Sequence, residues 1–191
     1  MSEILVIYGT SEGQTEKIAK RISEVITDKG HDVERVYAKE TPPGLAFKDY
    51  DGVIVGASIH VGKFQDYVHD LVERNSDLLN DKLSAFFSVS LTAAGDEPDD
   101  EKQAREYVDT FVKETGWHPD MIGIFAGALK YSEYGFIKRS MMKKIAKKAG
   151  WETDTSRDYE YTDWEDVMDF AESFADAVER VDSPENRSED Q

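Results

Sequence analysis

The sequence of 191 residues contains no cysteine, which excludes disulfide bonds, thiolate metal sites, iron–sulfur clusters and cysteine nucleophiles. Any redox chemistry must therefore come from a bound cofactor. Histidine is also scarce, and His31, His69 and His118 lack the spacing of metal ligands. We expect these three side chains on the surface and predict no metal site.

Long hydrophobic runs are missing as well. No apolar stretch approaches the length of a membrane span, and the first residues run directly into a strand-like segment without the basic start of a signal peptide. We therefore expect a cytoplasmic protein, either free or held peripherally at the inner face of the cell membrane.

The chain has few positive charges. It contains 40 acidic and 23 basic side chains, and its formal net charge is -17. Such a surface disfavours nucleic acid as a partner. It repels itself at low ionic strength and is tolerable when salt screens it, so we interpret it as adaptation to a high-salt cytoplasm.

Apolar runs of strand type alternate with amphipathic helical stretches along the chain. Strands are predicted at residues 4–8, 32–37, 53–57, 85–89 and 121–126, with apolar residues at helical spacing between them. This alternation predicts an α/β fold with a doubly wound parallel sheet in the order 2-1-3-4-5. We expect one domain over residues 1–181, with an insertion at 128–161, and a disordered acidic tail at 182–191. Thr162 and Glu165 have capping-box spacing before the last helix.

In such a sheet, ligands bind beyond the carboxyl ends of the strands, near the first and third strands. The loop at residues 9–15 leads from the first strand into a helix, where backbone N–H groups and three hydroxyls can hold a phosphate. The loop has no Walker A lysine, so ATP or GTP with magnesium is disfavoured. It also lacks a G-x-G-x-x-G motif, which weakens a dinucleotide-binding interpretation.

This loop resembles the phosphate loop of the flavodoxin family, Thr-x-Thr-Gly-x-Thr, through Thr10, Gly13 and Thr15. The resemblance implies a flavodoxin-like fold and non-covalent FMN, with the phosphate held by Thr10, Ser11, Glu12, Gly13, Gln14 and Thr15. Glu12 departs from the pattern, which has threonine there. A carboxylate would repel a phosphate dianion, so either Glu12 points to solvent or the phosphate affinity is reduced.

The resemblance also implies contacts to the flavin ring from two further loops. After the third strand these residues are Ser58, Ile59, His60, Val61 and Gly62, and after the fourth strand they are Ser88, Val89, Ser90, Leu91, Thr92 and Ala93. His60 either donates a hydrogen bond or proton near the flavin or faces solvent. The third loop has no Trp or Tyr, so we expect one flavin face to be open to a substrate, which favours an enzyme over an electron carrier.

The insertion concentrates basic residues in an otherwise acidic chain. Residues 130–148 hold seven of the 23 basic side chains, with Glu133 as their only acid. Apolar residues interleave with these cations at helical spacing and predict a basic amphipathic helix, namely Phe136, Ile137, Met141, Met142, Ile145 and Ala149. We expect this helix to dock on an anionic membrane or an acidic partner, with an intramolecular lid or a salt-bridged face as the alternative.

A narrower resemblance covers residues 3 to about 180. The chain is similar to the flavodoxin-like, quinone-dependent protoporphyrinogen IX dehydrogenase family through the segments Gly13-Gln14-Thr15, Gly56-Ala57-Ser58-Ile59, Ser84-Ala85-Phe86-Phe87-Ser88-Val89, Ala126-Gly127-Ala128-Leu129-Lys130-Tyr131, Gly150-Trp151-Glu152-Thr153-Asp154-Thr155 and Tyr161-Thr162-Asp163-Trp164-Glu165. The match includes the insertion, which small carrier flavodoxins lack.

This resemblance implies FMN-dependent six-electron oxidation of protoporphyrinogen IX to protoporphyrin IX, with a respiratory quinone such as menaquinone as acceptor. The implied partners are the porphyrinogen, a membrane quinone and an anionic membrane surface. Candidate residues for the propionates or the membrane are Lys130, Tyr131, Lys138, Arg139, Lys143 and Lys144; no general base is assigned. Alternatives are a flavodoxin-type electron carrier, an NAD(P)H:quinone reductase and a flavin-free docking module.

Overall fold

The computed structural model describes residues 1–95 and 97–182 and contains a five-stranded parallel sheet in the order β2-β1-β3-β4-β5. The strands are β1 (Glu3–Tyr8), β2 (Asp32–Tyr37), β3 (Gly52–Ser58), β4 (Leu83–Ser90) and β5 (Met121–Ala126). The predicted fold class and strand order are confirmed. The acidic tail predicted to be disordered lies, after Asp182, outside the described residues.

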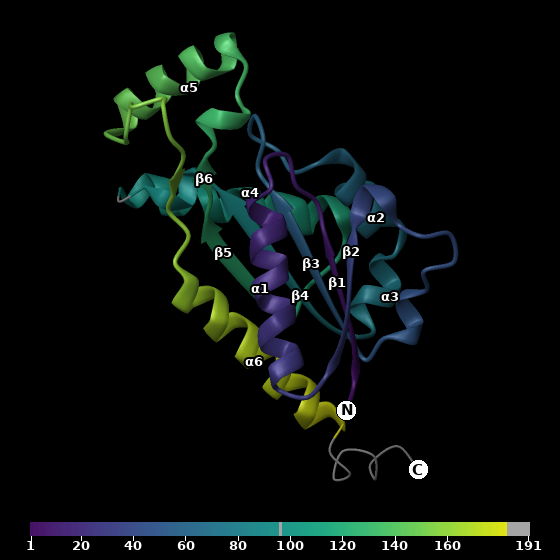
Figure 1. Ribbon diagram of the computed structural model, residues 1–191. Coiled ribbons are helices and arrows are strands. Elements are labelled where there is room, and N and C mark those ends of the chain that lie inside the picture. The colour runs from purple at the N-terminus through teal and green to yellow at the C-terminus, as the bar shows by residue number, and fades with distance from the viewer. Residues whose placement is uncertain (96, 183–191) are drawn as a thin grey trace.

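Helices cover both faces of the sheet (Figure 1). One face packs against α1 (Gln14–Asp28) and α6 (Trp164–Asp182), and the other packs against α2 (Asp66–Arg74), α3 (Ser76–Asn80) and α4 (Pro98–Thr115). Short 3-10 turns occupy Ala38–Glu40, Phe47–Asp49, Thr92–Ala94 and Tyr131–Glu133. Among the described residues, no helix combines the length and the apolar character needed to cross a bilayer.

The apolar run in β1 explains why this strand lies in the interior of the sheet, between β2 and β3. Side chains of a strand alternate between the two faces, so Ile4 and Val6 pack toward α1 and α6 while Leu5 and Ile7 pack toward α2 and α4. All four are fully buried. A strand that is apolar on both faces can be satisfied only between two helical layers.

The last helix begins differently from the capping-box prediction, which was wrong in its N-cap. The backbone N–H groups of Glu165 and Asp166 donate to Oδ1 of Asp163, at 2.9 and 3.4 Å, so Asp163 caps α6. Thr162 instead accepts a hydrogen bond from Nε2 of Gln14 and donates to the carbonyl of Ala126. Its hydroxyl therefore joins α1 to the end of β5.

His31 was predicted on the surface, and this was also wrong. Its side chain is 4% exposed, and Nε2 lies 3.8 Å from a carboxylate oxygen of Glu179 on α6. His31 lies directly before β2, in the connection from α1, where the helix packed against α1 covers it. His118 is exposed, as predicted.

The insertion after β5 forms a small unit beyond the carboxyl ends of the strands (Figure 1). Two short strands, β6 (Ala128–Leu129) and β7 (Tyr159–Glu160), pair antiparallel and flank α5 (Phe136–Ala149). A separate apolar cluster of buried residues holds the unit together, namely Leu129, Tyr131, Tyr134 and Ala146. The basic helix predicted from the sequence is thus present, with a core of its own.

Gly56 in β3 provides a test of the packing below the site. A methyl group at this position would lie 2.0 Å from Cζ of the fully buried Phe87. Gly56→Ala should therefore lower the free energy of unfolding by about 1–3 kcal/mol in a urea titration. At Gly127 the nearest atoms to an added Cβ are 3.5 Å away. Gly127→Ala is the matched control, and equal destabilisation of both variants would contradict this packing.

Candidate functional site

The loop between β1 and α1 turns sharply at Gly13, whose φ of 82° lies in the left-handed region. The backbone N–H of Gly13 donates to Oγ1 of Thr10 at 2.9 Å, and that of Thr10 donates to the hydroxyl of Tyr67 at 3.2 Å. Gly13 is also the N-cap of α1 and gives it no side-chain cap. The first N–H groups of α1 therefore point into the loop without an intrahelical acceptor.

Two buried polar atoms in the first turn of α1 have no hydrogen-bond partner among the described residues: Oγ1 of Thr15 and Oε1 of Gln14. Thr15 is fully buried. A buried hydroxyl without a partner is costly, which indicates a ligand atom at this position. Together with the free N–H groups and the positive end of the helix dipole, the loop fits a phosphate monoester.

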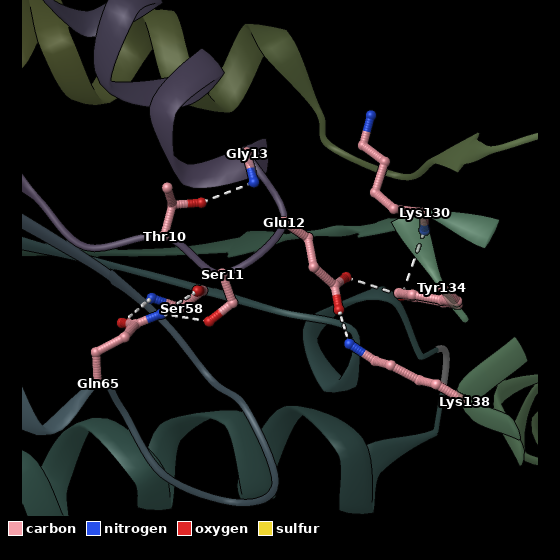
Figure 2. A network of polar contacts seen from close by, with 9 residues as sticks. All are labelled: Thr10, Ser11, Glu12, Gly13, Ser58, Gln65, Lys130, Tyr134 and Lys138. Carbon is pink, nitrogen blue, oxygen red and sulfur yellow. Dashed lines mark hydrogen bonds and ion pairs between the residues drawn. The ribbon is translucent and has the colours of Figure 1, made fainter. Parts of the chain in front are cut away.

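Gln65 joins the first loop to the second, and sequence reasoning missed it. Its Nε2 donates to Oγ of Ser58 at 2.6 Å and to Oγ of Ser11 at 3.2 Å, while its Oε1 accepts from the N–H of Ser58 at 3.2 Å (Figure 2). Gln65 directly precedes α2, so its place in the sequence indicates a helix N-cap and gives no sign of a contact to the first loop. One amide side chain thus sets the distance between the two loops.

The second loop carries a strained turn. The backbones of His60 and Lys63 form an antiparallel bridge, with the N–H of His60 donating to the carbonyl of Lys63 at 2.8 Å. Both residues between them have positive φ, 52° at Val61 and 80° at Gly62, as in a type I′ turn. Val61 is β-branched, so this conformation is unfavourable, and its side chain is nevertheless 89% exposed.

The third loop lies beside the second, since the N–H of Ile59 donates to the carbonyl of Val89 at 2.9 Å. Its hydroxyl at Ser90 accepts from the N–H of Ala93 at 3.1 Å and shapes the 3-10 turn at Thr92–Ala94. Ser88 is buried in β4, and its Oγ has no partner among the described residues.

These three loops and the insertion enclose a cavity of about 470 Å³. The predicted residues that line it are Thr10, Ser11, Glu12, Gln14, Thr15, Ser58, Ile59, His60, Val61, Val89, Ser90, Leu91 and Lys138. Residues not singled out as ligands also line it, namely Gly127, Ala128, Tyr134, Met141, Met142 and Ile145. Gly13, Gly62, Ser88, Thr92 and Ala93 are not among the lining residues; Ala93 borders a different hollow.

The sequence left two possibilities for Glu12, namely that it points to solvent or that it weakens phosphate binding. In the structure its carboxylate is instead paired with residues of the insertion. Its Oε1 accepts from Nζ of Lys138 at 2.5 Å, and its Oε2 accepts from the hydroxyl of Tyr134 at 2.8 Å (Figure 2). Nζ of Lys138 also lies 4.5 Å from the centre of the Tyr134 ring. We call these three residues the Glu12 clamp, because it fastens the insertion to the first loop.

Tyr134 brings an aromatic ring to the cavity that the third loop does not supply. Burial, with the negative charge of Glu12 as a second cause, raises the pKa of its phenol above the ordinary value. Tyr134 therefore stays protonated and acts as a hydrogen-bond donor to Glu12. No signal in the sequence placed this tyrosine, because its partner lies more than a hundred residues away.

Several basic and aromatic residues of the insertion do not face the cavity. Arg139 donates from Nε and Nη2 to the carbonyls of Tyr131 and Tyr134, so it holds the turn before α5. Tyr131 is fully buried and its hydroxyl donates to the carbonyl of Glu152, which contradicts the expectation that it meets a propionate or a membrane. The side chain of Lys130 points away from the Glu12 clamp (Figure 2). Lys143 and Lys144 are exposed on α5.

His69 lies close to other potential metal ligands, which its spacing from the other histidines did not indicate. On α2, ligand atoms of His69, Asp70 and Glu73 lie within 4.8 Å of one another, and Nε2 of His69 is 3.5 Å from a carboxylate oxygen of Glu114. The side chain of His69 is 28% exposed, so it lies partly on the surface. None of these residues lines the cavity of the Glu12 clamp.

Comparison with known proteins places this geometry in a family. A model described as "Flavodoxin domain" matches residues 5–156. The chain is 35% identical to the protoporphyrinogen IX dehydrogenase [quinone] of Escherichia coli over 92% of its own length and 96% of that protein. The protein of the same name from Leishmania major is 34% identical over 90% of this chain and 74% of its own length.

Solved structures share the fold at lower identity. Oxidised flavodoxin 1 from Bacillus cereus superposes with a TM-score of 0.55 and 17% identity, covering 93% of this chain and 98% of the flavodoxin. This likeness supports the fold, while the two dehydrogenases match a similar share of the chain at about twice the sequence identity. The chain therefore belongs to the flavodoxin-like, quinone-dependent protoporphyrinogen IX dehydrogenase family.

Proposed function

We propose that this protein is an FMN-dependent dehydrogenase that oxidises protoporphyrinogen IX and passes the electrons to a respiratory quinone, with menaquinone as the first choice. The observation that carries the proposal is 35% identity over 92% of the chain to a protein named for this reaction. The aligned length is too great for the flavodoxin core alone, so it includes the insertion that borders the cavity.

The residues that line the cavity match the chemical groups of FMN. The N–H groups of the first loop, with the hydroxyl of Thr15, offer donors to the phosphate. Ile59, Val89 and Leu91 offer apolar contacts to a flat ring. When bound there, FMN supplies the redox chemistry that the side chains of this cysteine-free chain lack.

The mouth of the cavity suits an apolar organic substrate. Met141, Met142 and Ile145 from α5 line the cavity, as does Val61 of the strained turn. A tetrapyrrole and a quinone both present large apolar surfaces, which such side chains contact without leaving polar groups unpaired. The third loop contributes neither Trp nor Tyr to the cavity, where the aromatic ring comes from Tyr134 of the insertion.

The proposed reaction is tested by anaerobic mixing of the FMN-loaded protein with protoporphyrinogen IX and a menaquinone analogue in high salt. Porphyrin fluorescence should rise faster than in protein-free solution, and only while quinone remains. If NADH reduces the flavin and protoporphyrinogen IX does not, the protein is instead an NAD(P)H:quinone reductase. Reduction of the flavin without turnover of the menaquinone analogue would favour an electron carrier.

Thr15→Val tests the phosphate cradle, since it removes a buried donor and keeps the side-chain shape. The dissociation constant for FMN, measured by quenching of flavin fluorescence, should rise roughly 10- to 100-fold, because a hydrogen bond to a charged group is worth about 1.5–3 kcal/mol. The free energy of unfolding of the FMN-free protein should not fall, because the hydroxyl has no hydrogen-bond partner within the described part of the chain.

The matched control is Thr27→Val at the other end of α1, where the hydroxyl donates to the carbonyl of Ser23. This variant should bind FMN like the unmodified chain. An unchanged FMN affinity in Thr15→Val would remove the hydroxyl from the phosphate site. Thr10 is less informative, because its Oγ1 already holds the N–H of Gly13 and its loss would deform the loop.

We also propose that α5 rests on an anionic membrane surface. Phe136 and Ile137 are 88% and 84% exposed, and Met141 and Ile145 continue this apolar stripe at 52% and 44%. Lys143, Lys144 and Lys147 are exposed on the same helix. The combination of an apolar stripe with flanking lysines is typical of helices that lie in the headgroup region.

The apolar stripe is continuous with the cavity, which links docking to quinone access. Met141 and Ile145 belong to both, so the cavity mouth would open toward the bilayer in which a respiratory quinone is dissolved. A chain with a net charge of -17 is repelled by an anionic surface except where cations gather, which restricts the docking orientation to this helix.

Replacing Lys143, Lys144 and Lys147 by Gln should weaken sedimentation with phosphatidylserine-containing vesicles by about two orders of magnitude, at about 1 kcal/mol per lysine near the surface. Flavin affinity should stay unchanged. The control replaces Lys20, Lys39 and Lys113, which are exposed elsewhere and carry the same charge. Equal loss in both triple variants, or no loss in either, would contradict docking through α5.

A further inference from the structure

The Glu12 clamp places a carboxylate inside a loop whose other groups are arranged for an anion. Glu12 and Lys138 both line the cavity, and Glu12 lies between Thr10 and Thr15 in the turn that leads into α1. The Glu12 and Lys138 side chains are only 21% and 36% exposed. At such partly buried positions, water screens their charges incompletely.

Taken alone, Glu12 would oppose the phosphate. A like charge a few ångströms from a phosphate dianion costs binding free energy, and the N–H groups of the loop carry only partial positive charge. No basic residue next to Glu12 in the sequence compensates this charge, because the next cation along the chain is Lys17, whose Nζ pairs with Glu160 at 2.9 Å. The compensating charge comes from Lys138 on α5 instead.

We propose that Lys138 is a positioning residue that acts through Glu12: by neutralising this carboxylate it allows the first loop to hold the FMN phosphate, and so couples cofactor retention to docking of the insertion. The inference rests on the proposed function, because it takes FMN as the ligand. It assigns Lys138 to the first loop rather than to a propionate or a membrane phosphate.

Coupling of this kind is reciprocal. The ion pair and the hydrogen bond from Tyr134 attach the insertion to the first loop, and a phosphate bound there makes the neutralised form of Glu12 more favourable. FMN therefore holds the insertion over the cavity as strongly as the insertion holds FMN. An apoprotein should keep its sheet while losing part of the attachment of α5.

A double-mutant cycle with Lys138→Gln and Glu12→Gln tests the proposal, with FMN and riboflavin as the two probes. Lys138→Gln should raise the dissociation constant for FMN by about tenfold, the effect of one uncompensated charge at short range. Adding Glu12→Gln should restore the affinity to within about threefold of the unmodified chain, because the repulsive charge is then gone. Riboflavin lacks the phosphate, so its affinity should not change in any variant.

Each other outcome overturns the proposal. If the double variant binds FMN as weakly as Lys138→Gln, the lysine contacts the phosphate directly. If riboflavin and FMN weaken together, the clamp has a merely structural role. Lys144→Gln, on the exposed side of the same helix, is the control for loss of one positive charge. If the unmodified chain binds neither probe, the proposed function fails, whereas an unchanged FMN affinity in Lys138→Gln overturns only this inference.

Discussion

The first turn of α1 carries backbone N–H groups that no helical carbonyl can reach, and the cavity is organised around them. Their position follows from the central strand β1, which is apolar on both faces and ends at the edge where all five strands end. Gly13 then reverses the chain in a left-handed conformation that side chains disfavour. The buried hydroxyl of Thr15, which no other group in residues 1–95 and 97–182 pairs with, lies in the same turn.

The uneven distribution of charge explains which groups in this site can bind an anion. The chain has few cations, so donors to an anion are amides and hydroxyls rather than lysines. Among the described residues, the lysine that pairs with the first loop is Lys138, and its partner there is Glu12. Lys143, Lys144 and Lys147 of α5 are exposed instead and do not line the cavity.

Local patterns were sufficient to predict the layers of the fold. The apolar run of β1 and the glycine at position 116, where α4 ends with φ of 69°, act within a few residues and are visible in any sequence window. The capping box failed because Thr162 had two better partners, Gln14 and the carbonyl of Ala126, from distant segments. His31 was misplaced since only the position of α6 buries it.

In the site, too, some features were predictable from local patterns and others were not. Its loops were predicted because strand ends meet at one edge of a parallel sheet, a rule that needs no side-chain detail. Gln65 and Tyr134 were missed, because the first bridges two loops and the second crosses from the insertion to Glu12. Contacts between side chains far apart in the sequence leave no periodic signal.

The insertion has its own small apolar cluster, separate from the two that stabilise the sheet. Parts of a protein that rest on few buried contacts open at a lower free energy than the whole molecule unfolds. The cavity therefore has one wall that belongs to the sheet and one that belongs to the insertion, and we expect the insertion to open at a lower free energy than the sheet. Such opening would admit a bulky ligand without disturbing β1, β3 or β4, so the same chain combines a stable sheet with an entrance of lower local stability.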